Sequence, residues 1–489
     1  MSTVSDPPAT QQLLIGGRWR DAEAGRTHDV IGVGEQPVTR QAAASAADAR
    51  AAADAAAAAL PAWSATAPEE RRDLLTRAGE LLGSRAEEIA ATMAQETGGT
   101  FGWGMFNVGL AADILTAAGA LATEPVAEAV ASRVPGLRSQ AVRRPLGVCV
   151  GIAPWNAPVI LGTRAVAWPL AFGNTVVMKA SEQSPRTHAA IVQALLDAGL
   201  PDGAVNLITN DPADAGAVVD ALIEHPAVRH VNFTGSTRVG RLIAQKAAGE
   251  LKRTLLELGG KAPLVVLDDA DLDAAAAAAS FGAFMNAGQI CMSTERVVID
   301  ERALDEFAKR IATRAEELSV GDPSDPATQV GPVVNEAALR HVRELIDDAV
   351  ANGAQVLAGG THDGLLHRPT VIAGVTPQMR IYAEESFGPL LAIVAADGEE
   401  DAIRIANDTA YGLSSAVFSG DPERGLRVAA QIESGICHVN GSTVHDEAPA
   451  PFGGVKASGW GRFGAGQVAA EFTDTRWITV SEEERHYPI

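Results

Sequence analysis

The feature that most constrains the fold is an alternation of short apolar runs with helix-like segments, which begins at Leu146. Runs of this length and composition predict buried strands. They lie at residues 146–153, 174–179, 204–208, 230–234 and 263–267. The segments between them predict helices at residues 186–199, 212–224 and 236–249. Strands that alternate with helices predict a mainly parallel, doubly wound α/β sheet, which binds ligands beyond the carboxyl ends of its strands.

A second alternation follows Cys291 and predicts a second α/β domain. Its strands are expected at residues 296–300, 390–396, 414–419 and 435–440, and its helices at 303–318, 401–407 and 423–432. We place the boundary near Gly259 and Gly260. A length of 489 residues agrees with more than one domain. The predicted fold class is therefore two doubly wound α/β domains.

The charge balance and the cysteines exclude several classes of protein. The chain has 39 Lys and Arg against 61 Asp and Glu, a net charge of −22, which is unfavourable for binding nucleic acid or an anionic membrane. Its three cysteines form neither a disulfide framework nor a CxxC metal site. Residues 1–10 lack a signal pattern, and no run approaches about 20 uninterrupted apolar residues. We expect a cytoplasmic protein with no metal.

Cys291 is the candidate nucleophile. A lone cysteine is usually a small buried hydrophobe. Cys149 and Cys437 lie inside apolar, strand-like runs and fit that interpretation. Cys291 instead follows a break at Ala287 and Gly288, after a helical stretch at 274–286, and has polar neighbours.

Two further motifs could serve such a nucleophile. Glu257 stands between leucines and before two glycines, where burial would raise its pKa as a general base requires; pairing with a Lys or Arg is at least as good an interpretation. Asn156 lies between prolines that fix its loop, so its amide could donate to an oxyanion, or it could cap the next helix.

Two motifs suggest a binding site for a dinucleotide. Gly235 and Ser236 lie where a strand runs into a helix, whose N-terminus could bind phosphate, although a Ser N-cap explains them equally well. Lys179 ends a strand and Glu182 follows it, so both would stand at the carboxyl edge of the sheet, where a ribose could be held.

These five motifs occur together, and in this order, in the aldehyde dehydrogenase superfamily, which the chain resembles from about Leu14 to its end. The stretches 384–389 (EESFGP) and 451–459 (PFGGVKASG) look like further signatures of it. Within the superfamily the chain is most similar to bacterial aromatic aldehyde dehydrogenases, of the salicylaldehyde, vanillin and benzaldehyde types. The residues that carry this similarity are 103–108, 233–240, 289–296 and 438–444.

The resemblance implies roles for the motif residues. Cys291 would attack the aldehyde carbon, the oxyanion would lie between the Asn156 amide and the Cys291 N–H, and Glu257 would activate the water that hydrolyses the thioester. The presence of Glu257 favours a free acid as product, because branches that pass the acyl group to coenzyme A usually lack this base.

The resemblance also implies a cofactor, NAD, with NADP possible. Glu182 would accept from the ribose 2′-hydroxyl and repel a 2′-phosphate. The remaining expected contacts are with the riboses, the pyrophosphate and the nicotinamide. They would come from Lys179, Glu385, Gly235, Ser236, Phe387, Ile152, Trp155 and Leu258.

The expected substrate pocket departs from the bulky lining common in the family, because Ala157, Leu161 and Arg164 follow the Asn156 motif. Arg164 could attract a phenolate or carboxylate on the substrate, or could turn to solvent or pair with an acidic neighbour. The segment around Trp103 could form an aromatic side of the pocket, or it could pack in the hydrophobic core. The other pocket residues we expect are Met105, Phe106, Ile290, Met292 and Val444.

By analogy, residues 126–144 form a projecting hairpin that, with residues 477–480, pairs with a neighbouring subunit, so that the protein is a homodimer or homotetramer. The expected domains are a NAD-binding domain, a catalytic domain and an oligomerisation element. Their residues are 1–125 with 146–258, then 259–470, then 126–145 with 471–489.

Our main hypothesis is NAD-dependent oxidation of an aromatic aldehyde to the acid. An aliphatic semialdehyde dehydrogenase is the alternative within the same chemistry. A structural protein that reuses the fold is disfavoured because every catalytic motif residue is present. A thiol hydrolase would need a His partner for its nucleophile, and no His lies in a motif of that kind.

Overall fold

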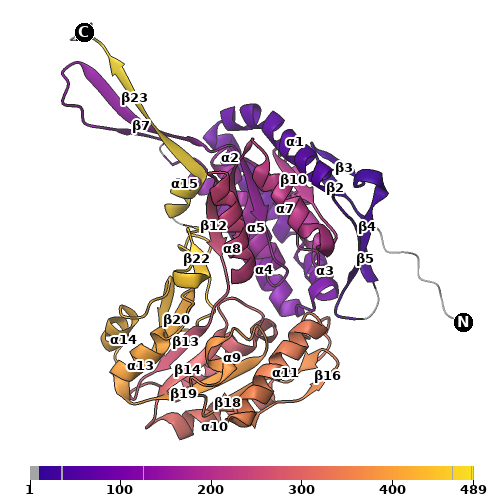
Figure 1. The fold of residues 1–489 in the computed structure, drawn as a ribbon, viewed down its shortest axis with the longest axis vertical. Helices are drawn as coiled ribbons and strands as arrows, with labels where there is room; N and C mark the ends of the chain where they lie inside the picture. The colour runs from indigo at the N-terminus through magenta and orange to yellow at the C-terminus, as the bar shows by residue number, and fades with distance from the viewer. Residues whose placement is uncertain (1–9, 35–36, 125, 465, 486, 488) are drawn as a thin grey trace, which may run out of the picture.

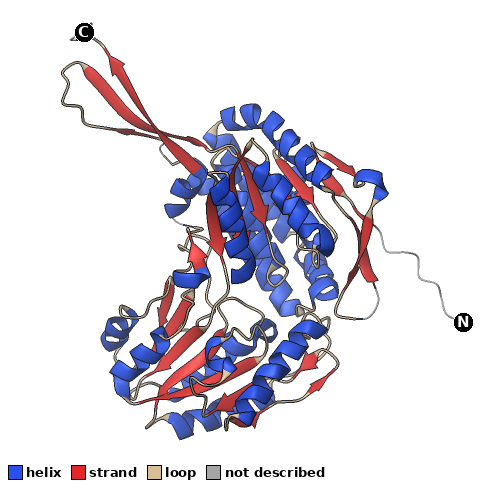
Figure 2. Cartoon of the chain, viewed as in Figure 1, coloured by secondary structure: helices blue, strands red, loops and turns tan. Residues whose placement is uncertain are grey.

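A computed structural model describes residues 10–34, 37–124, 126–464, 466–485, 487 and 489. Figure 1 shows two α/β bodies, the second below the first, and a slender arm that projects from the first body. Helices cover both faces of each sheet (Figure 2). The predicted fold class, two doubly wound α/β domains, is confirmed.

The upper body is built on an eight-stranded sheet in the order β22-β12-β11-β8-β9-β10-β2-β3. Its five central strands are parallel. They are β8 (Val148–Ile152), β9 (Thr175–Lys179), β10 (Val205–Ile208), β11 (Val228–Thr234) and β12 (Arg253–Glu257). The antiparallel edges are β2 (Leu13–Ile15), β3 (Arg18–Arg20) and β22 (Gly459–Trp460). The strand order reverses between β8 and β11, which makes the space beyond their carboxyl ends a switch point where ligands bind.

The helices of the upper body bury most of its apolar surface. They are α1 (Ala46–Ala65), α2 (Pro68–Gly83), α3 (Ala86–Thr97), α4 (Phe101–Ala122), α5 (Pro158–Ala171), α6 (Pro185–Asp197), α7 (Ala215–Glu224) and α8 (Thr237–Gly249). Every residue of α5 is buried, because this helix passes between the sheet and α4. By length and composition α4 could cross a membrane, but it packs on α2, α3 and α5 as a core helix does.

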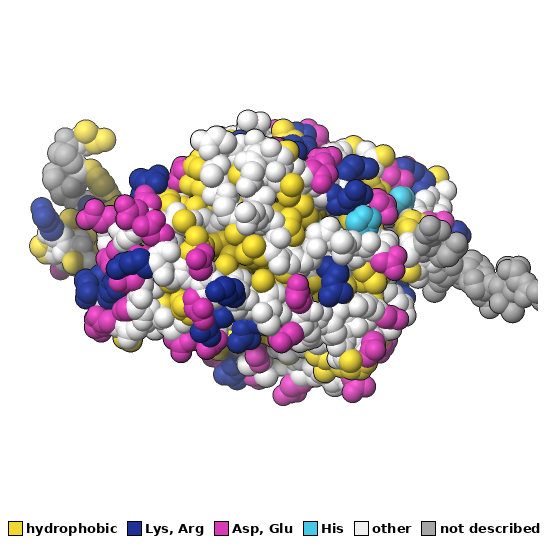
Figure 3. Space-filling view, turned by 90° about the horizontal axis from the view of Figure 1, so that it is seen from below, with side chains coloured by type: hydrophobic (Ala, Val, Ile, Leu, Met, Phe, Trp, Pro, Cys, Tyr) yellow, Lys and Arg dark blue, Asp and Glu magenta, His cyan; other side chains and the backbone are white. Residues whose placement is uncertain are grey.

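The lower body has a seven-stranded sheet in the order β15-β18-β19-β14-β13-β20-β21. Its strands are β13 (Ala262–Val266), β14 (Thr294–Asp300), β15 (Gln355–Ala358), β18 (Thr370–Ala373), β19 (Leu390–Ala396), β20 (Ser414–Phe418) and β21 (Ile436–Val439). Its helices are α9 (Leu272–Phe284), α10 (Leu304–Glu317), α11 (Glu336–Ala351), α12 (Arg380–Ala383), α13 (Gly398–Asn407) and α14 (Pro422–Ala429). Charges of both signs are interspersed on the face seen from below (Figure 3).

The arm consists of β6 (Ala127–Ala129), β7 (Leu137–Pro145) and β23 (Thr473–Ser481), and α15 (Gln467–Phe472) leads into it. β7 and β23 pair antiparallel along their whole length, from Thr473 opposite Pro145 to Ser481 opposite Leu137. Trp477, near the middle of β23, is 70% exposed. Two small sheets complete the fold. They contain β1 (Thr10–Gln11), β4 (Thr27–Ile31) and β5 (Pro37–Ala42), and β16 (His362–Asp363) with β17 (Leu366–His367).

Three differences from the sequence-based expectation concern the segments around Glu257 and Cys291. The strand expected at 263–267 is β13, which belongs to the lower sheet, so the second alternation begins before Cys291. β12 was not expected, because its sequence RTLLE has only two adjacent apolar residues. The helix expected at 274–286 ends at Phe284, since Asn286 and Ala287 take left-handed backbone angles.

Candidate active site

The candidate site lies where the carboxyl ends of the upper sheet face the amino ends of the lower sheet. Asn156 follows β8, Lys179 ends β9, Gly235 follows β11 and Glu257 ends β12. Cys291 comes from the other side, just before β14. Five segments far apart in the sequence therefore meet at one place, the switch point of the upper sheet.

The loop that carries Cys291 has a constrained backbone. Asn286 and Ala287 have φ angles of 50° and 54°, which are uncommon for residues other than glycine. Gln289 fastens the loop, since its side chain donates to the Asn286 carbonyl at 3.1 Å and accepts from the Val334 N–H at 2.8 Å. Cys291 is partly exposed, and its N–H has no acceptor among the described residues.

Asn156 is held against this loop by hydrogen bonds. Its side-chain Nδ2 donates to the backbone carbonyl of Gln289 at 2.9 Å. Its backbone carbonyl accepts from Trp103 Nε1 and Asn286 Nδ2, each at 3.0 Å. It does not cap α5, which begins after Ala157 without a side-chain cap. A carboxamide nitrogen carries two hydrogens, so one can still donate to an oxygen beside the Cys291 N–H.

Glu257 is a buried carboxyl group that forms no ion pair within the part of the chain that the structure describes. Neither of its oxygens has a hydrogen-bond partner among the described residues. The two basic residues nearest in sequence pair elsewhere, Lys261 with Glu295 at 2.7 Å and Arg253 with Asp474, so the alternative of a Glu257 ion pair with either is not observed. Burial raises the pKa of Glu257 well above its usual value, and Arg164 and Arg462 only partly offset this. A carboxyl of this kind is suited to a general base near neutral pH.

Burial and nearby charges also change the pKa of the candidate nucleophile, Cys291. Burial, followed by the charges of Glu257 and Glu385, raises the pKa of the Cys291 thiol, whereas the charge of Arg164 lowers it. The two other cysteines lie in strands: Cys149 is fully buried in β8 and Cys437 is in β21. Cys291 is therefore the cysteine that faces a carboxyl group and a cavity.

Lys179 and Glu182 form an ion pair at the end of β9. Asn210 Nδ2 also donates to Glu182 Oε1, at 3.0 Å. Burial raises the pKa of Glu182, but the charge and the hydrogen bond of Lys179 outweigh it, and the pKa is lowered. The pair presents an ammonium donor and an ionised carboxylate acceptor, a set that fits ribose hydroxyls.

The N-terminus of α8 follows β11 at the same edge of the upper sheet. Ser236 caps it by accepting from the Val239 N–H at 3.5 Å, so the N-cap interpretation holds, and Gly235 donates its N–H to the Glu257 carbonyl at 2.9 Å. Leu258 is buried against α8, so close to Gly240 that a Cβ there would lie 2.4 Å from Leu258 Cδ2. Ile152 is buried at the end of β8. A helix N-terminus with free N–H groups at a switch point fits a pyrophosphate.

Glu385 and Phe387 approach from the lower body. Glu385 Oε1 accepts from the Gly260 N–H at 2.8 Å, and burial raises the pKa of Glu385 to about 7. Phe387 has a φ of 44° and lies edge-on to Trp155, with ring centroids 5.8 Å apart. Glu295 holds this loop by accepting from the N–H groups of Ser386 and Phe387 at 2.9 and 3.2 Å.

A cavity of about 250 Å³ opens at Cys291. Its lining is mostly apolar and aromatic. The lining residues expected from the sequence are Trp103, Phe106, Ala157, Leu161, Arg164, Ile290, Met292 and Val444. Met105 does not line the cavity. It lies on α4 between Trp103 and Phe106, and successive helical residues point about 100° apart. Trp103 and Phe106 stack, with ring centroids at 5.5 Å.

Arg164 is neither exposed nor unpaired. It forms an ion pair with Asp446 at 2.6 Å, and the two side chains are 3% and 7% exposed. Its guanidinium also lies 4.1 Å from the centre of the Phe452 ring. Pairing with an acidic neighbour, one of the two alternatives to a substrate-binding role, is therefore the arrangement observed.

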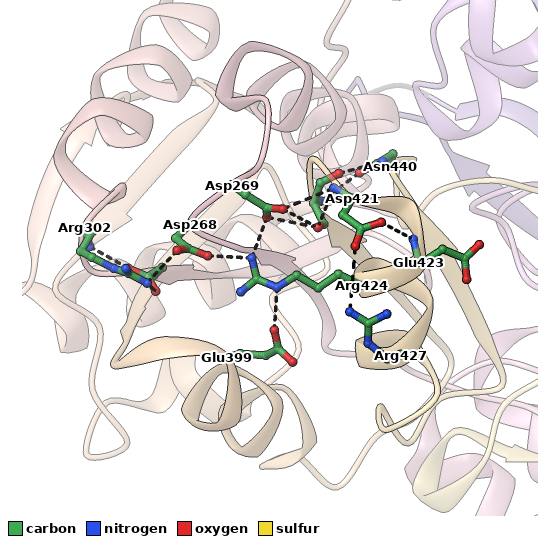
Figure 4. A network of polar contacts seen from close by, with 11 residues as sticks. Asp268, Asp269, Arg302, Glu399, Asp421, Glu423, Arg424, Arg427 and Asn440 are labelled. Atoms are coloured by element: carbon green, nitrogen blue, oxygen red, sulfur yellow. Dashed lines mark hydrogen bonds and ion pairs between the residues drawn. The ribbon is translucent and has the colours of Figure 1, made fainter.

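The switch point of the lower sheet, between β13 and β20, is filled by side chains. Arg424 contacts Asp268, Asp269 and Glu399 there at 2.7–3.0 Å, and Arg302 contacts Asp268 from the other side at 3.0 Å (Figure 4). This ion-pair network occupies the position at which a doubly wound sheet commonly binds a ligand. The described residues contain no cluster that could hold a metal.

Several residues of the site were not found from the sequence. Asp446, Phe452 and His445 lie in a loop without regular structure, and Phe281 and Met285 lie on or beside α9. Phe452 belongs to the stretch 451–459 but carried no role there, and the others look like ordinary surface or core residues until the chain folds. Glu295 was noticed only as part of the stretch 289–296, and its burial with Lys261 has no signal in a single sequence.

The model of the family described as "Aldehyde dehydrogenase family" matches residues 19–478. The vanillin dehydrogenase of Pseudomonas fluorescens is 53% identical over 478 residues, which cover 98% of this chain and 99% of that one. The salicylaldehyde dehydrogenase of Pseudomonas putida is 45% identical over 480 residues, with 98% and 99% covered. The crystal structure of a salicylaldehyde dehydrogenase from Pseudomonas putida G7 with salicylaldehyde is 44% identical and has a TM-score of 0.97, covering 99% of this chain and 100% of that one.

Proposed function

Since the chain belongs to the aldehyde dehydrogenase family, we propose that it oxidises aromatic aldehydes to carboxylic acids, with NAD as the preferred hydride acceptor. The observation that carries the proposal is the meeting of Asn156 and Glu257 with Cys291, which itself lines an aromatic cavity. The similarity to vanillin and salicylaldehyde dehydrogenases supports the aromatic substrate class.

In the first half of the proposed reaction, the Cys291 thiol loses its proton to water, the thiolate sulfur bonds to the aldehyde carbon, and the carbonyl oxygen takes the negative charge. The Asn156 Nδ2 and the Cys291 N–H donate to this oxygen, as their unused hydrogens allow. A nicotinamide dinucleotide would supply the hydride acceptor, and loss of hydride leaves a thioester on Cys291.

In the second half Glu257 takes a proton from water, which attacks the thioester carbon. The carbon–sulfur bond then breaks and the acid leaves, and Glu257 passes its proton to the Cys291 sulfur, which becomes a thiol again. A base with a raised pKa is matched to this step, because it can both accept the proton and return it near neutral pH. With Glu257 present, water is the expected acyl acceptor.

Family members use a nicotinamide dinucleotide, and the preference for NAD over NADP is part of our proposal. Lys179 and Glu385 would hold ribose hydroxyls, while Gly235 and Ser236 would face the pyrophosphate. Ile152, Trp155, Leu258 and Phe387 would pack on the cofactor. The ionised Glu182 would accept from a 2′-hydroxyl and disfavour a 2′-phosphate.

A homodimer or homotetramer is proposed on the strength of the arm, since a slender sheet with an exposed Trp477 gains stability when a second subunit covers it. The proposed domain limits lie near Gly259 and at both ends of the arm. A cytoplasmic location is proposed as well, supported by three cysteines without a disulfide.

The direct test is a substrate panel of benzaldehyde, vanillin, salicylaldehyde and succinic semialdehyde, with NAD or NADP, followed by dinucleotide absorbance. We expect the highest kcat/KM among the aromatic aldehydes with NAD. Cys291→Ala should abolish turnover, and Cys149→Ala, the matched control, should retain it. A clear preference for succinic semialdehyde would replace the proposal with the semialdehyde alternative.

A further inference from the structure

We infer that Asp446 is a specificity-determining residue, which neutralises Arg164 and so makes the cavity select uncharged aromatic aldehydes over aldehydes that carry a carboxylate. The inference rests on the proposed function and concerns its substrate class. Asp446 does not need to touch the substrate for this, so it is a positioning and charge-balancing residue.

The first observation is the pairing itself. Arg164 comes from α5, directly after the Asn156 loop, and Asp446 comes from the loop after β21. They meet at 2.6 Å with both side chains buried. Among the described residues, Asp446 is the one carboxylate within hydrogen-bond distance of Arg164.

The second observation is the charge of the cavity. Among its lining residues, Arg164 is the one Arg or Lys and Asp446 is the one Asp or Glu, and the two form an ion pair with each other. The remainder of the wall is mainly aromatic and aliphatic. A carboxylate that enters such a cavity loses its hydration and finds the only cation already paired, so its binding is unfavourable.

The third observation is that the Arg164 guanidinium also packs on an aromatic ring. The Phe452 ring covers the guanidinium at 4.1 Å, which holds it in place by a cation–π contact. If Asp446 lost its charge, Arg164 would thus remain in the wall of the cavity as an unpaired cation. The cavity would then favour an anion.

Asp446 also lies where the cavity at Cys291 meets a groove on the surface. It lines the cavity at Cys291 and, together with Phe106, a wider groove of about 790 Å³ along the outer face of α4. Phe106 is 43% exposed. A substrate that enters from this groove passes the ion pair before it reaches Cys291, so the pair is placed to discriminate between neutral and anionic rings.

The test compares two aldehydes of similar shape, 4-formylbenzoate and its methyl ester, in the wild type and in Asp446→Asn. The expected result is a rise of about tenfold or more in the kcat/KM ratio of acid to ester, since a charge-assisted hydrogen bond is of this strength. The ratio cancels any effect of the lost charge on Cys291 or Glu257, because both aldehydes meet the same nucleophile and base.

Three further variants separate selectivity from a structural role. Asp446→Glu keeps the charge and should keep the wild-type ratio. Asp446→Asn combined with Arg164→Met removes the cation and should return the ratio to the wild-type value or below. Asp29→Asn, which removes a carboxylate that pairs with Arg40 at the same 2.6 Å but lies in β4, outside the cavity and the groove, should leave the ratio unchanged.

The inference is overturned if folded Asp446→Asn shows an unchanged ratio, or if both aldehydes lose the same factor of kcat/KM. It is also overturned if the double variant keeps the raised ratio. Failure of the proposed function would look different, because the wild type would then turn over neither aromatic aldehyde.

Discussion

Gly260→Ala should disable catalysis while leaving the fold largely intact. A Cβ on Gly260 would lie 2.2 Å from the Cys291 carbonyl oxygen, whereas real Cβ atoms keep at least 3.0 Å from such atoms. The obstacle is backbone, which cannot swing aside as a side chain can, so the backbones of Gly260 and Cys291 must separate by at least 0.8 Å, the difference between these distances.

That displacement affects the sulfur and the oxyanion donor of Cys291 together. A misplacement of about 1 Å at reacting groups costs roughly 10²-fold in rate, so we expect a loss of about 10²-fold in kcat/KM. Overpacking of this kind costs about 1–3 kcal/mol of stability, which a large two-domain protein tolerates.

The assay is NADH formation from benzaldehyde, together with a thermal melt of each variant. Gly216→Ala is the matched control, because Gly216 lies in α7 with no atom within 4 Å of the added Cβ, and it should keep wild-type activity. A folded Gly260→Ala with kcat/KM within about twofold of the wild type would refute the reasoning, since the Cys291 loop would then be far more adjustable than its contacts imply.

Other perturbations follow from the same geometry. Glu257→Gln should lower steady-state turnover by at least about 10²-fold. In the wild type, turnover should fall as the pH decreases through the raised pKa of Glu257, because the protonated acid cannot accept a proton; an acid limb near the usual Glu value would contradict this. Glu182→Ala should narrow the NAD over NADP preference in kcat/KM, and an unmoved ratio would remove Glu182 from that role. Arg424→Ala should lower the free energy of unfolding by about 1–2 kcal/mol without changing kcat, since Asp269 and Glu399 lose their cation and Asp268 keeps only Arg302. Arg427→Ala, at a longer and more exposed pair, should change it by less than about 0.5 kcal/mol.

The parallel strands could be predicted from the sequence because they are buried on both faces. Segments such as β8 and β19 are continuous apolar runs, and β19 was placed at its observed limits. β12 could not be recognised in this way. It has a polar first half and ends in Glu257, and its strand conformation comes from pairing with β11 on one side and β22 on the other.

Some residues of the candidate site could likewise be predicted from local sequence, and others depend on contacts that form only in the fold. Cys291, Asn156 and Glu257 lie in short segments whose glycines and prolines mark unusual backbone, so they could be found before folding. Asp446 could not, because its importance arises from a contact with Arg164 that spans 282 positions in the sequence. Met105 illustrates a third limit, since a residue on the correct helix can still point away from the cavity.

The central claim is that Cys291 carries the acyl group and that Glu257 is needed to release it. The most direct measurement is mass spectrometry of Glu257→Gln after incubation with benzaldehyde and NAD, followed by peptide mapping. The account predicts a benzoyl adduct on the peptide that contains Cys291, which is absent from Cys291→Ala with Glu257→Gln. An adduct on Cys149 or Cys437, or no adduct while the acid is still formed at the wild-type rate, would contradict it.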